Sequence, residues 1–431
     1  MNYNHFLFSF AFFVIPLLVS CDNDKNEGDA PVQEQLPVSS AVTSFTATVS
    51  GGFGDAVSSQ DIISGLCGVL YSTGEDATDA FNSWAEGNDN ADCQVYSRAR
   101  VNSDGSLTSQ IERLKPETTY SYCLFYKSKS GKKRAISSTG SFTTKPFNPE
   151  VITADAAEVR YFNAKINGQI KVDAEDLKLC KTGIMLSDNR NDLPAGTVFD
   201  ANEIASDGSF TASFSKLNHS TDYYYRTYLY VEHVDYKSYG EIKTVQTRNV
   251  DDMAVDMGLS VKWASCDFMA QTPEEDGECY AWGMNESFKK GSLDNYKYYS
   301  NGSYMDIGQS ICGNPDYDVV SHVYGGKWRM PSESEVRELF ENCTIEIVKG
   351  TNENFLLFQT KNGASFKISV MAKWFSTAGY SSTGKATYRW TGTLSENEDD
   401  NAYVFQTGGQ EYKPLAVKRY QELSIRPVCD Y

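Results

Sequence analysis

Two stretches of the chain repeat the same alternation of apolar and polar residues. Residues 103–122, SDGSLTSQIERLKPETTYSY, align without a gap with residues 206–225, SDGSFTASFSKLNHSTDYYY. Two pairs of shorter segments upstream repeat in the same order, SFTATVSG with YFNAKING and CGVLYS with TGIMLS. Alternating apolar residues bounded by turn-forming residues predict strands. The repeat therefore predicts two β-domains in tandem.

A tyrosine pattern within the repeat indicates what kind of β-domain this is. Residues 114–122 read Leu-x-Pro-x-Thr-x-Tyr-x-Tyr. The pattern resembles the tyrosine corner of fibronectin type III domains, in which a tyrosine hydroxyl bonds to the backbone just upstream. The resemblance implies two immunoglobulin- or fibronectin-III-like sandwiches, residues 37–146 and 147–249, with Tyr120 and Tyr223 at the corners. Rigid sandwiches in series suit a spacer, and no feature of either repeat suggests a ligand.

After residue 250 the repeat stops, and the segment GGKWRMPSESEVRELFENC predicts a helix. Ser332 suits the N-cap position, and Glu335 three residues later completes a capping box. The apolar residues that follow fall on one helical face: Val336, Leu339, Phe340 and Cys343. The acidic residues elsewhere on the helix are expected to face solvent: Glu333, Glu338 and Glu341.

Strand signals follow this helix. Lys361-Asn362-Gly363 separates FLLFQT from SFKISV, and Asn-Gly between two such runs predicts a hairpin. One helix, several short strands and long polar loops predict a small α+β domain over residues 250–431. Trp328 is expected in its core, with Arg329 paired locally.

The N-terminus carries an apolar run, FLFSFAFFVIPLLVS at residues 6–20, that is too short to span a bilayer comfortably. The run leads into LVSC, which resembles the bacterial lipobox, and the resemblance implies cleavage before Cys21 and acylation of that residue. Residues 1–20 are thus predicted to be a lipoprotein signal peptide, and residues 21–36 a polar tether. We expect a lipid-anchored outer-membrane protein exposed at the cell surface. An ordinary secretory signal with a coincidental cysteine is the alternative.

The charge balance argues against a nucleic-acid partner. The chain has 57 acidic and 39 basic residues, a formal net charge of −18, and its longest basic run is Lys132-Lys133-Arg134. A phosphate-binding surface needs more clustered lysine and arginine than this. Of ten cysteines, nine remain beyond Cys21, so at least one thiol has no partner within the chain.

Six motifs after residue 250 occur in an order that carries a family resemblance. They are DMGLSVKWASCDF, YAWG, DIGQSICG, YGGKWRMPSESEVRELFENC, YRWTGT and SIRPVCDY. Together they resemble the FISUMP-type "major paralogous domain" of gut-bacterial (Bacteroidetes-type) surface lipoproteins, related to the C-terminal domain of collagen-like bacterial adhesins. The resemblance implies a C-type-lectin-like α+β fold, displayed for binding. More remotely it extends to the formylglycine-generating enzymes.

Catalytic and metal chemistry find little support in the residues. Of four histidines only His322 follows residue 250, so neither a histidine-based zinc site nor a Ser-His-Asp triad is expected there. No catalytic residue, metal site or cofactor is predicted. Asn314-Pro315-Asp316 is interpreted as a turn. The acidic run at residues 396–400 is interpreted as a solvated loop, with Ca²⁺ ligation as the alternative.

Aromatic residues in polar segments are the ligand candidates, because sugars bind to flat aromatic faces flanked by polar groups. The candidates are Trp374, Tyr380, Tyr388, Tyr298, Tyr299 and Tyr304. Packing in the core or in turns is the alternative for each of them. The core itself is expected to hold Trp263, Trp282, Trp328 and Trp390.

Three functions follow from these patterns. The first is display of a glycan- or protein-binding lectin-like domain on two sandwich spacers, for adhesion or glycan capture. The second is a cap or structural subunit of a surface fibre. The third, an enzyme of the formylglycine-generating type using Cys266, Cys279 or Cys312, is the weakest, since no cysteine pair matches that motif. Because lectin-like folds bridge a helix to the last strand, the resemblance also suggests a disulfide between Cys343 and Cys429.

Overall fold

The computed structural model describes residues 37–431 except 54–56, 58–60, 63–64, 103–104, 276, 288–290, 351–353, 371–373, 377–378, 382–387, 397 and 408–410. The chain divides into two compact units, one ending at Pro146 and the other beginning at Phe147. Both are rich in β-structure. Among the described strands every pairing is antiparallel except the one between β28 and β31. The predicted signal peptide, Cys21 and the tether lie outside the described residues.

The first unit contains two sheets that share a core. One sheet has the order β1 (Val38–Ser40), β2 (Ala47–Gly51), β6 (Leu107–Ile111), β5 (Arg100–Val101). The other has the order β4 (Gln94–Tyr96), β3 (Leu66–Thr73), β7 (Thr119–Lys127), β8 (Arg134–Ile136), and β9 (Gly140–Thr143) also pairs with β7. Val49 and Leu107 of the first sheet pack with Val69 and Leu124 of the second.

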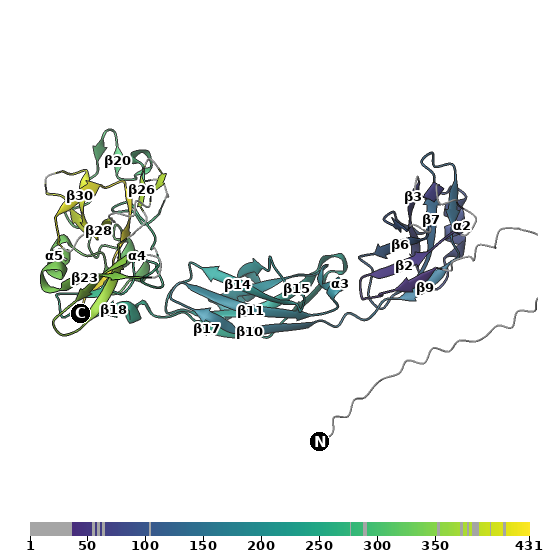
Figure 1. Ribbon diagram of the computed structural model, residues 1–431, viewed down its shortest axis with the longest axis horizontal. Coiled ribbons are helices and arrows are strands. Elements are labelled where there is room, and N and C mark those ends of the chain that lie inside the picture. Colours follow the sequence, from purple (N-terminus) through teal and green to yellow (C-terminus); the bar gives the residue numbers. More distant parts are fainter. Residues whose placement is uncertain are drawn as a thin grey trace, which may run out of the picture. The chain divides into compact units, whose positions relative to one another are not determined.

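Helix α2 (Thr78–Ala85) covers the outer face of the second sheet (Figure 1). Its Phe81 and Trp84 pack on Cys123 and Phe125 of β7, and Arg134 places its guanidinium carbon 4.7 Å from the Trp84 ring centroid. Strand β7 is therefore buried on both faces.

The second unit opens with two sheets arranged on the same plan. One has the order β10 (Glu150–Val159), β11 (Asn163–Lys171), β14 (Ser209–Ser215). The other has the order β13 (Thr197–Asp200), β12 (Lys181–Ser187), β15 (Asp222–Val231), β16 (Tyr236–Tyr239), with β17 (Lys243–Gln246) also on β15. The short helices are α3 (Ala174–Leu177), η2 (Arg190–Ala195) and η3 (Glu232–Val234). One core joins both sheets, through Ile166 and Phe210 on one side and Ile184 and Tyr225 on the other.

The two tyrosines of the repeat make equivalent hydrogen bonds. The Tyr120 hydroxyl accepts the backbone N–H of Lys115 at 2.9 Å, and the Tyr223 hydroxyl accepts that of Asn218 at 2.9 Å. Each bond reaches five residues upstream, as in the tyrosine corner that the sequence resembles.

The described residues from 250 onward form small sheets and four helical segments. One sheet contains β18 (Ala254–Val255), β19 (Lys262–Ala264), β22 (Trp328–Arg329) and β32 (Val428–Cys429), and a two-stranded sheet contains β20 (Tyr299–Ser300) and β21 (Ser303–Tyr304). A three-stranded sheet contains β23 (Thr344–Lys349), β24 (Asn354–Gln359) and β25 (Ser365–Ser369). A six-stranded sheet contains β26 (Trp374–Ser376), β27 (Gly379–Ser381), β28 (Tyr388–Leu394), β29 (Asn401–Gln406), β30 (Leu415–Lys418) and β31 (Glu422–Ile425). The helices are η4 (Val250–Met253), α4 (Val319–Tyr324) and α5 (Glu333–Asn342), with a 3₁₀ turn η5 (Leu293–Asn295). Figure 1 shows the β20 hairpin at the end of this region away from β18.

Three predictions made for this region from the sequence are confirmed: the capping box, the hairpin and the buried tryptophans. Helix α5 begins at the predicted capping box, with Ser332 Oγ accepting the Glu335 N–H and Glu335 accepting the Ser332 N–H. Strands β24 and β25 form the predicted hairpin, with Gly363 at φ +90°. The four tryptophans expected in the core are buried: Trp263, Trp282, Trp328 and Trp390.

Two expectations about α5 are wrong. Glu333 is largely covered: its side chain is 15% exposed and accepts hydrogen bonds from Tyr412 and Arg337. Glu338 is partly exposed, and both its carboxylate oxygens accept the Ser260 N–H. Cys343 and Cys429 form no disulfide, and both are free thiols. Cys343 packs at the edge of the core beneath α5, whereas Cys429 belongs to the core on the other side of β32.

A shared core connects the second pair of sheets to the region after residue 250. Phe162, at the start of β11, stacks on Tyr324 of α4 with ring centroids 5.3 Å apart, and Val250 and Met253 of η4 are buried in the same cluster. The His219 ring N–H, at Nε2, donates to the Tyr324 carbonyl at 3.0 Å. These contacts hold residues 147–431 together as one compact unit.

Three charged side chains are buried at the centre of the region after residue 250. Asp267, Arg389 and Arg426 have 4%, 0% and 1% of their surface exposed. Arg389 Nη2 lies 2.7 Å from Asp267 Oδ2, and Arg426 Nε lies 2.8 Å from Asp267 Oδ1. Burial by itself would raise the pKa of Asp267, but the two guanidinium charges outweigh it and lower the pKa below its ordinary value.

Candidate functional site

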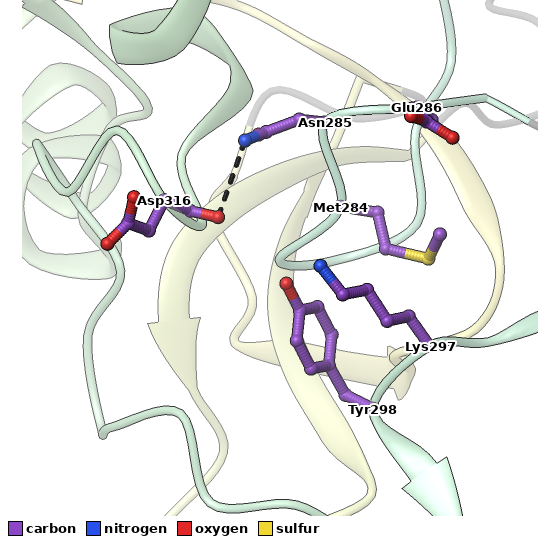
Figure 2. Close-up of a pocket in the computed structure, with 6 residues that line it drawn as sticks. All are labelled: Met284, Asn285, Glu286, Lys297, Tyr298 and Asp316. Carbon is purple, nitrogen blue, oxygen red and sulfur yellow. Dashed lines mark hydrogen bonds between the residues drawn. The ribbon is translucent and has the colours of Figure 1, made fainter.

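A cavity of about 350 Å³ opens beside the β20 hairpin (Figure 2). Three segments of the chain line it: the turn after Trp282, the residues after η5, and the turn before α4. The lining residues are Met284, Asn285, Glu286, Lys297, Tyr298 and Asp316. The size falls in the range of cavities that hold small ligands.

An aromatic cluster forms the wall of this cavity. Tyr298 is 5% exposed, and its ring lies 5.7 Å from Tyr296 and 5.6 Å from Tyr317, edge to face in both cases. Lys297 is exposed and places Nζ 5.4 Å from the Tyr298 ring centroid. Figure 2 shows the Lys297 side chain running alongside the ring toward its hydroxyl.

Arg419 holds the aromatic cluster beside the cavity in place. This buried guanidinium lies 4.9 Å from the Trp282 ring centroid, and its Nε donates to the Tyr296 hydroxyl at 3.1 Å. The Tyr296 hydroxyl in turn donates to the Trp282 carbonyl at 2.7 Å. Because both residues are held by buried hydrogen bonds, the tyrosine wall is preorganised.

The turn opposite the tyrosines is shaped by Gly283 and Asn285. Gly283 has φ +84°, and a Cβ atom there would lie 2.6 Å from Ile307 Cδ1, so only glycine fits. Asn285 Nδ2 donates to the carbonyls of Pro315 and Asp316 at 3.1 and 3.3 Å, and Figure 2 shows the second of these. Asn285 Oδ1 is buried and has no hydrogen-bond partner.

The predicted ligand residues are only partly brought together. Tyr298 lines the cavity, whereas Tyr299 and Tyr304 are half-buried and face each other across the β20–β21 hairpin at 5.0 Å. Tyr388 lies in β28, half-buried against the core and not among the lining residues. Trp374 and Tyr380 belong to the paired strands β26 and β27, and their side chains lie outside the described residues.

Five of the six lining residues were not predicted as ligand residues: Met284, Asn285, Glu286, Lys297 and Asp316. Asn314-Pro315-Asp316 does form a turn, with the Asp316 N–H donating to Asn314 Oδ1 at 3.1 Å, but Asp316 is also among the residues that line the cavity. Asn285 and Lys297 had no distinguishing local pattern. An Asn-Pro-Asp turn and the tyrosine-rich segment were the available signals, and neither alone shows that the two meet.

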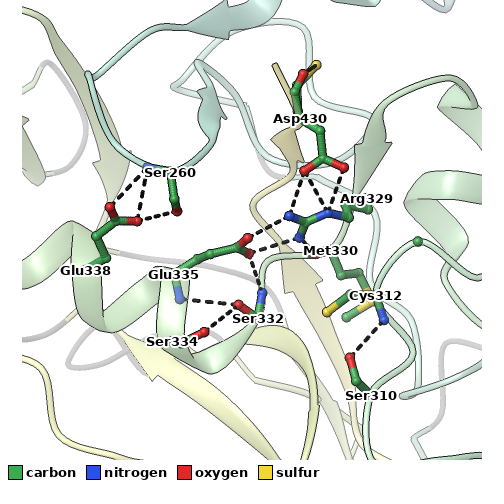
Figure 3. A network of polar contacts seen from close by, with 12 residues as sticks. Ser260, Ser310, Cys312, Arg329, Met330, Ser332, Ser334, Glu335, Glu338 and Asp430 are labelled. Carbon is green, nitrogen blue, oxygen red and sulfur yellow. Dashed lines mark hydrogen bonds and ion pairs between the residues drawn. The ribbon is translucent and has the colours of Figure 1, made fainter.

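A second polar group of residues, around Arg329, connects the helix α5 to the C-terminal strand (Figure 3). Arg329 Nη2 lies 2.6 Å from Glu335 Oε1 and 2.7 Å from Asp430 Oδ1. Hydrogen bonding to Glu335 is the main cause that raises the pKa of Arg329. Arg329 forms ion pairs with both carboxylates, so the group joins α5 to the C-terminal residues as a structural clasp.

The thiols considered for catalysis are poorly suited to it. Burial raises the pKa of Cys266, that of Cys279 to about 12 and that of Cys312 to about 11. Reactive cysteines need a lowered pKa, because the thiolate is the nucleophile. These thiols are protonated at neutral pH.

Metal ligation and membrane spanning find no support in the described part of the chain. No group of three or more His, Cys, Asp and Glu side chains there could hold a metal ion. In the acidic loop, Asp400 pairs with Lys418 and Glu398 accepts a bond from Asn401. No described helix is long and apolar enough to cross a membrane.

Comparison with known proteins gives limited guidance. No protein-family model matches the chain. No curated protein matches it either. Among solved structures, three of the sensor domain of the anti-sigma factor RsgI4 in Pseudobacteroides cellulosolvens are similar to 23% of this chain. The short form has 15% identity, 94% of its chain covered and a TM-score of 0.19, and the long form has 15% identity, 90% covered and a TM-score of 0.19. The solution structure has 13% identity, 74% of its chain covered and a TM-score of 0.18. Likeness at this level assigns neither a fold nor a function to the chain.

Proposed function

We propose that this protein is a lipid-anchored protein of the bacterial outer membrane that binds glycans at the cell surface through the cavity beside Tyr298. The proposal joins the lipobox-like LVSC, the tandem repeat and the FISUMP-type motifs to that cavity. Residues 37–146 and 147–249 are immunoglobulin- or fibronectin-III-like sandwiches in this proposal, and residues 250–431 a C-type-lectin-like domain. Two facing sheets with a common core and the tyrosine hydrogen bonds support the sandwich assignment.

The composition of the cavity carries the glycan assignment. One side is an aromatic wall at Tyr298, and the others offer amide, carboxylate and ammonium groups from Asn285, Asp316 and Lys297. A sugar ring has an apolar face and a rim of hydroxyls, so it needs such a mixture of surfaces. The buried Asn285 oxygen lacks a hydrogen-bond partner, and a ligand hydroxyl reaches this acceptor when the side chain rotates away from the carbonyls of Pro315 and Asp316.

A glycan array tests the proposal with residues 21–431 carrying C21S, which lack both the apolar run at residues 6–20 and the predicted acylation site. We expect a restricted set of bound glycans, and isothermal titration of a bound glycan should show an affinity reduced about 2- to 10-fold by N285A, the cost of one hydrogen bond. N354A, an exposed asparagine on β24, is the matched control and should leave the affinity unchanged. A blank array with folded protein would reject the glycan assignment.

An edge strand favours the structural alternative, a cap or subunit of a surface fibre. Strand β23 (TIEIVK) lies at the edge of its sheet, and Ile347 is 57% exposed there. An exposed edge can pair with a strand of another chain. Recovery of a stoichiometric partner with the wild-type protein, lost in an I347K variant, would support this role over glycan binding.

A further inference from the structure

The Tyr298 cavity already contains one positive charge from its own chain. Lys297 Nζ lies 5.4 Å from the ring centroid of Tyr298, within the roughly 6 Å over which a cation is attracted to an aromatic face. Lys297 forms no ion pair with any described residue, so this ring contact is its only charged interaction there. The aromatic wall at Tyr298 can thus hold an ammonium group.

The rim of the cavity carries more negative than positive charge. Glu286 and Asp316 both line it, both are exposed, and neither is neutralised by an ion pair with a described residue. Among the described lining residues, Lys297 carries the one positive charge against these two carboxylates. The whole chain adds to this balance with a formal net charge of −18. A ligand with a carboxylate or sulfate would therefore be repelled, while a second ammonium would be attracted.

A ligand for this site also needs an apolar face and a hydrogen-bond donor. Met284 and the Tyr298 ring supply apolar surface, and Asn285 Oδ1 supplies an acceptor with no partner of its own. From these features we propose that the glycan recognised here carries a free, protonated amino group, as in unacetylated hexosamine units. The inference rests on the proposed glycan-binding function and specifies its ligand class.

Lys297 has a particular role in this arrangement. Its ammonium holds the place over Tyr298 that the amino group of the sugar takes, so the two compete. Removing the lysine charge therefore strengthens binding of the amino sugar, whereas removing either carboxylate weakens it. Removing the charge of a lysine elsewhere on the surface has no such effect, because that lysine acts only on the general attraction between an acidic protein and a cation.

The test compares three tetrasaccharides of the same length on residues 21–431 carrying C21S: the glucosamine tetramer, its N-acetylated form and the glucose tetramer. Isothermal titration should give tighter binding of the glucosamine tetramer, by about 2- to 5-fold or more for one cation–aromatic contact. This comparison needs no variant, so it holds even if a substitution impairs folding.

Variants then localise the effect. E286Q and D316N should each weaken binding of the glucosamine tetramer by about 2- to 5-fold, as for one exposed ion pair. K297M should strengthen it by a similar factor. K349M, an exposed lysine on β23, is the matched control and should change the affinity by less than half as much.

The outcomes separate this inference from the proposed function. Equal or tighter binding of the acetylated or glucose tetramer would overturn the amino-sugar inference and leave glycan binding intact. No binding of any glycan would reject both. If a lysine tetrapeptide bound as tightly as the glucosamine tetramer, the site would recognise cations of polypeptides, and the inference would fail. Weaker binding by K297M would also overturn it.

Discussion

The substitution D267N would leave Arg389 and Arg426 without the carboxylate that lies between them. In the native structure Arg389 donates from Nε to both oxygens of Asp267 at 3.0 Å and from Nη2 at 2.7 Å, and Arg426 Nε lies 2.8 Å away. An amide of the same size keeps the volume but removes the negative charge. Two guanidinium groups then remain in a site that excludes water.

The expected loss can be bounded from the contacts that remain. Breaking a buried ion pair by removing one partner costs about 3–5 kcal/mol, because the other charge stays buried and uncompensated. Arg389 keeps hydrogen bonds to Thr407 Oγ1 at 3.0 Å and to the Ser369 carbonyl at 3.2 Å, and Arg426 keeps one to the Ala264 carbonyl at 3.1 Å. We therefore expect D267N to lower the free energy of unfolding by about 3–5 kcal/mol and not by more.

The pH dependence follows from the lowered pKa of Asp267. A carboxyl group with a lowered pKa in the folded state stabilises the fold above its unfolded value of about 3.9, and this stability is lost as the pH falls further through the folded value. Between pH 5 and 8 the difference between D267N and the native protein should thus stay constant. Below pH about 4 it should shrink, because Asp267 takes up a proton in the unfolded chain while it stays ionised in the folded protein, down to its lowered pKa.

Urea unfolding followed by tryptophan emission measures this loss, because five of the six tryptophans lie between residues 263 and 390. D294N, in the exposed 3₁₀ turn η5, is the control and should change stability by less than about 0.5 kcal/mol. If D267N lowered the free energy of unfolding by less than about 1 kcal/mol at pH 7, Asp267, Arg389 and Arg426 would not stabilise one another as buried charges do.

Other contacts give smaller, local effects. Y120F and Y223F should each lower the stability of their own pair of sheets by about 1 kcal/mol, since each removes the acceptor of a buried backbone N–H; calorimetry that shows both melting temperatures unchanged would contradict this. S332A should cost about 0.5–2 kcal/mol in the tryptophan-detected transition through loss of the N-cap, whereas S300A, at an exposed position of β20, should be neutral. Burial raises the pKa of Cys343 to about 11, so this thiol should react slowly with iodoacetamide at pH 8 and faster as the pH approaches 11. Peptide mapping without reductant should find both Cys343 and Cys429 alkylated. A bridged peptide containing both would refute the free-thiol assignment.

The features that the sequence predicts well are those set by near neighbours. The capping box joins residues three apart, the Asn-Gly hairpin turns within a few residues, and each tyrosine hydroxyl reaches only five residues back. In these cases the partner of each polar group is fixed by backbone geometry. The repeat predicted two β-rich parts in tandem, because the same pattern occurs twice.

Features assembled from distant segments escaped prediction. The Tyr298 cavity combines residues near 285, 298 and 316, and the buried charges join residues 267, 389 and 426. An aromatic residue in a polar segment looks the same whether it lines a cavity, as Tyr298 does, or packs against the core, as Tyr388 does. The family resemblance likewise suggested a bridge between Cys343 and Cys429, but a resemblance could not set the separation of the two sulfur atoms.

The core that Phe162 and Tyr324 share with η4 has a consequence for how the gene can be recombined. Val250 and Met253 are buried against Tyr161 and Phe162, so a crossover between codons 249 and 250 would cut through a packed interior. A hybrid made there would need the incoming partner to supply a matching Tyr-Phe pair. The segment that can be exchanged intact runs from residue 147 to 431, which predicts that natural chimaeras inherit the second β-repeat and the cavity-bearing region as one cassette.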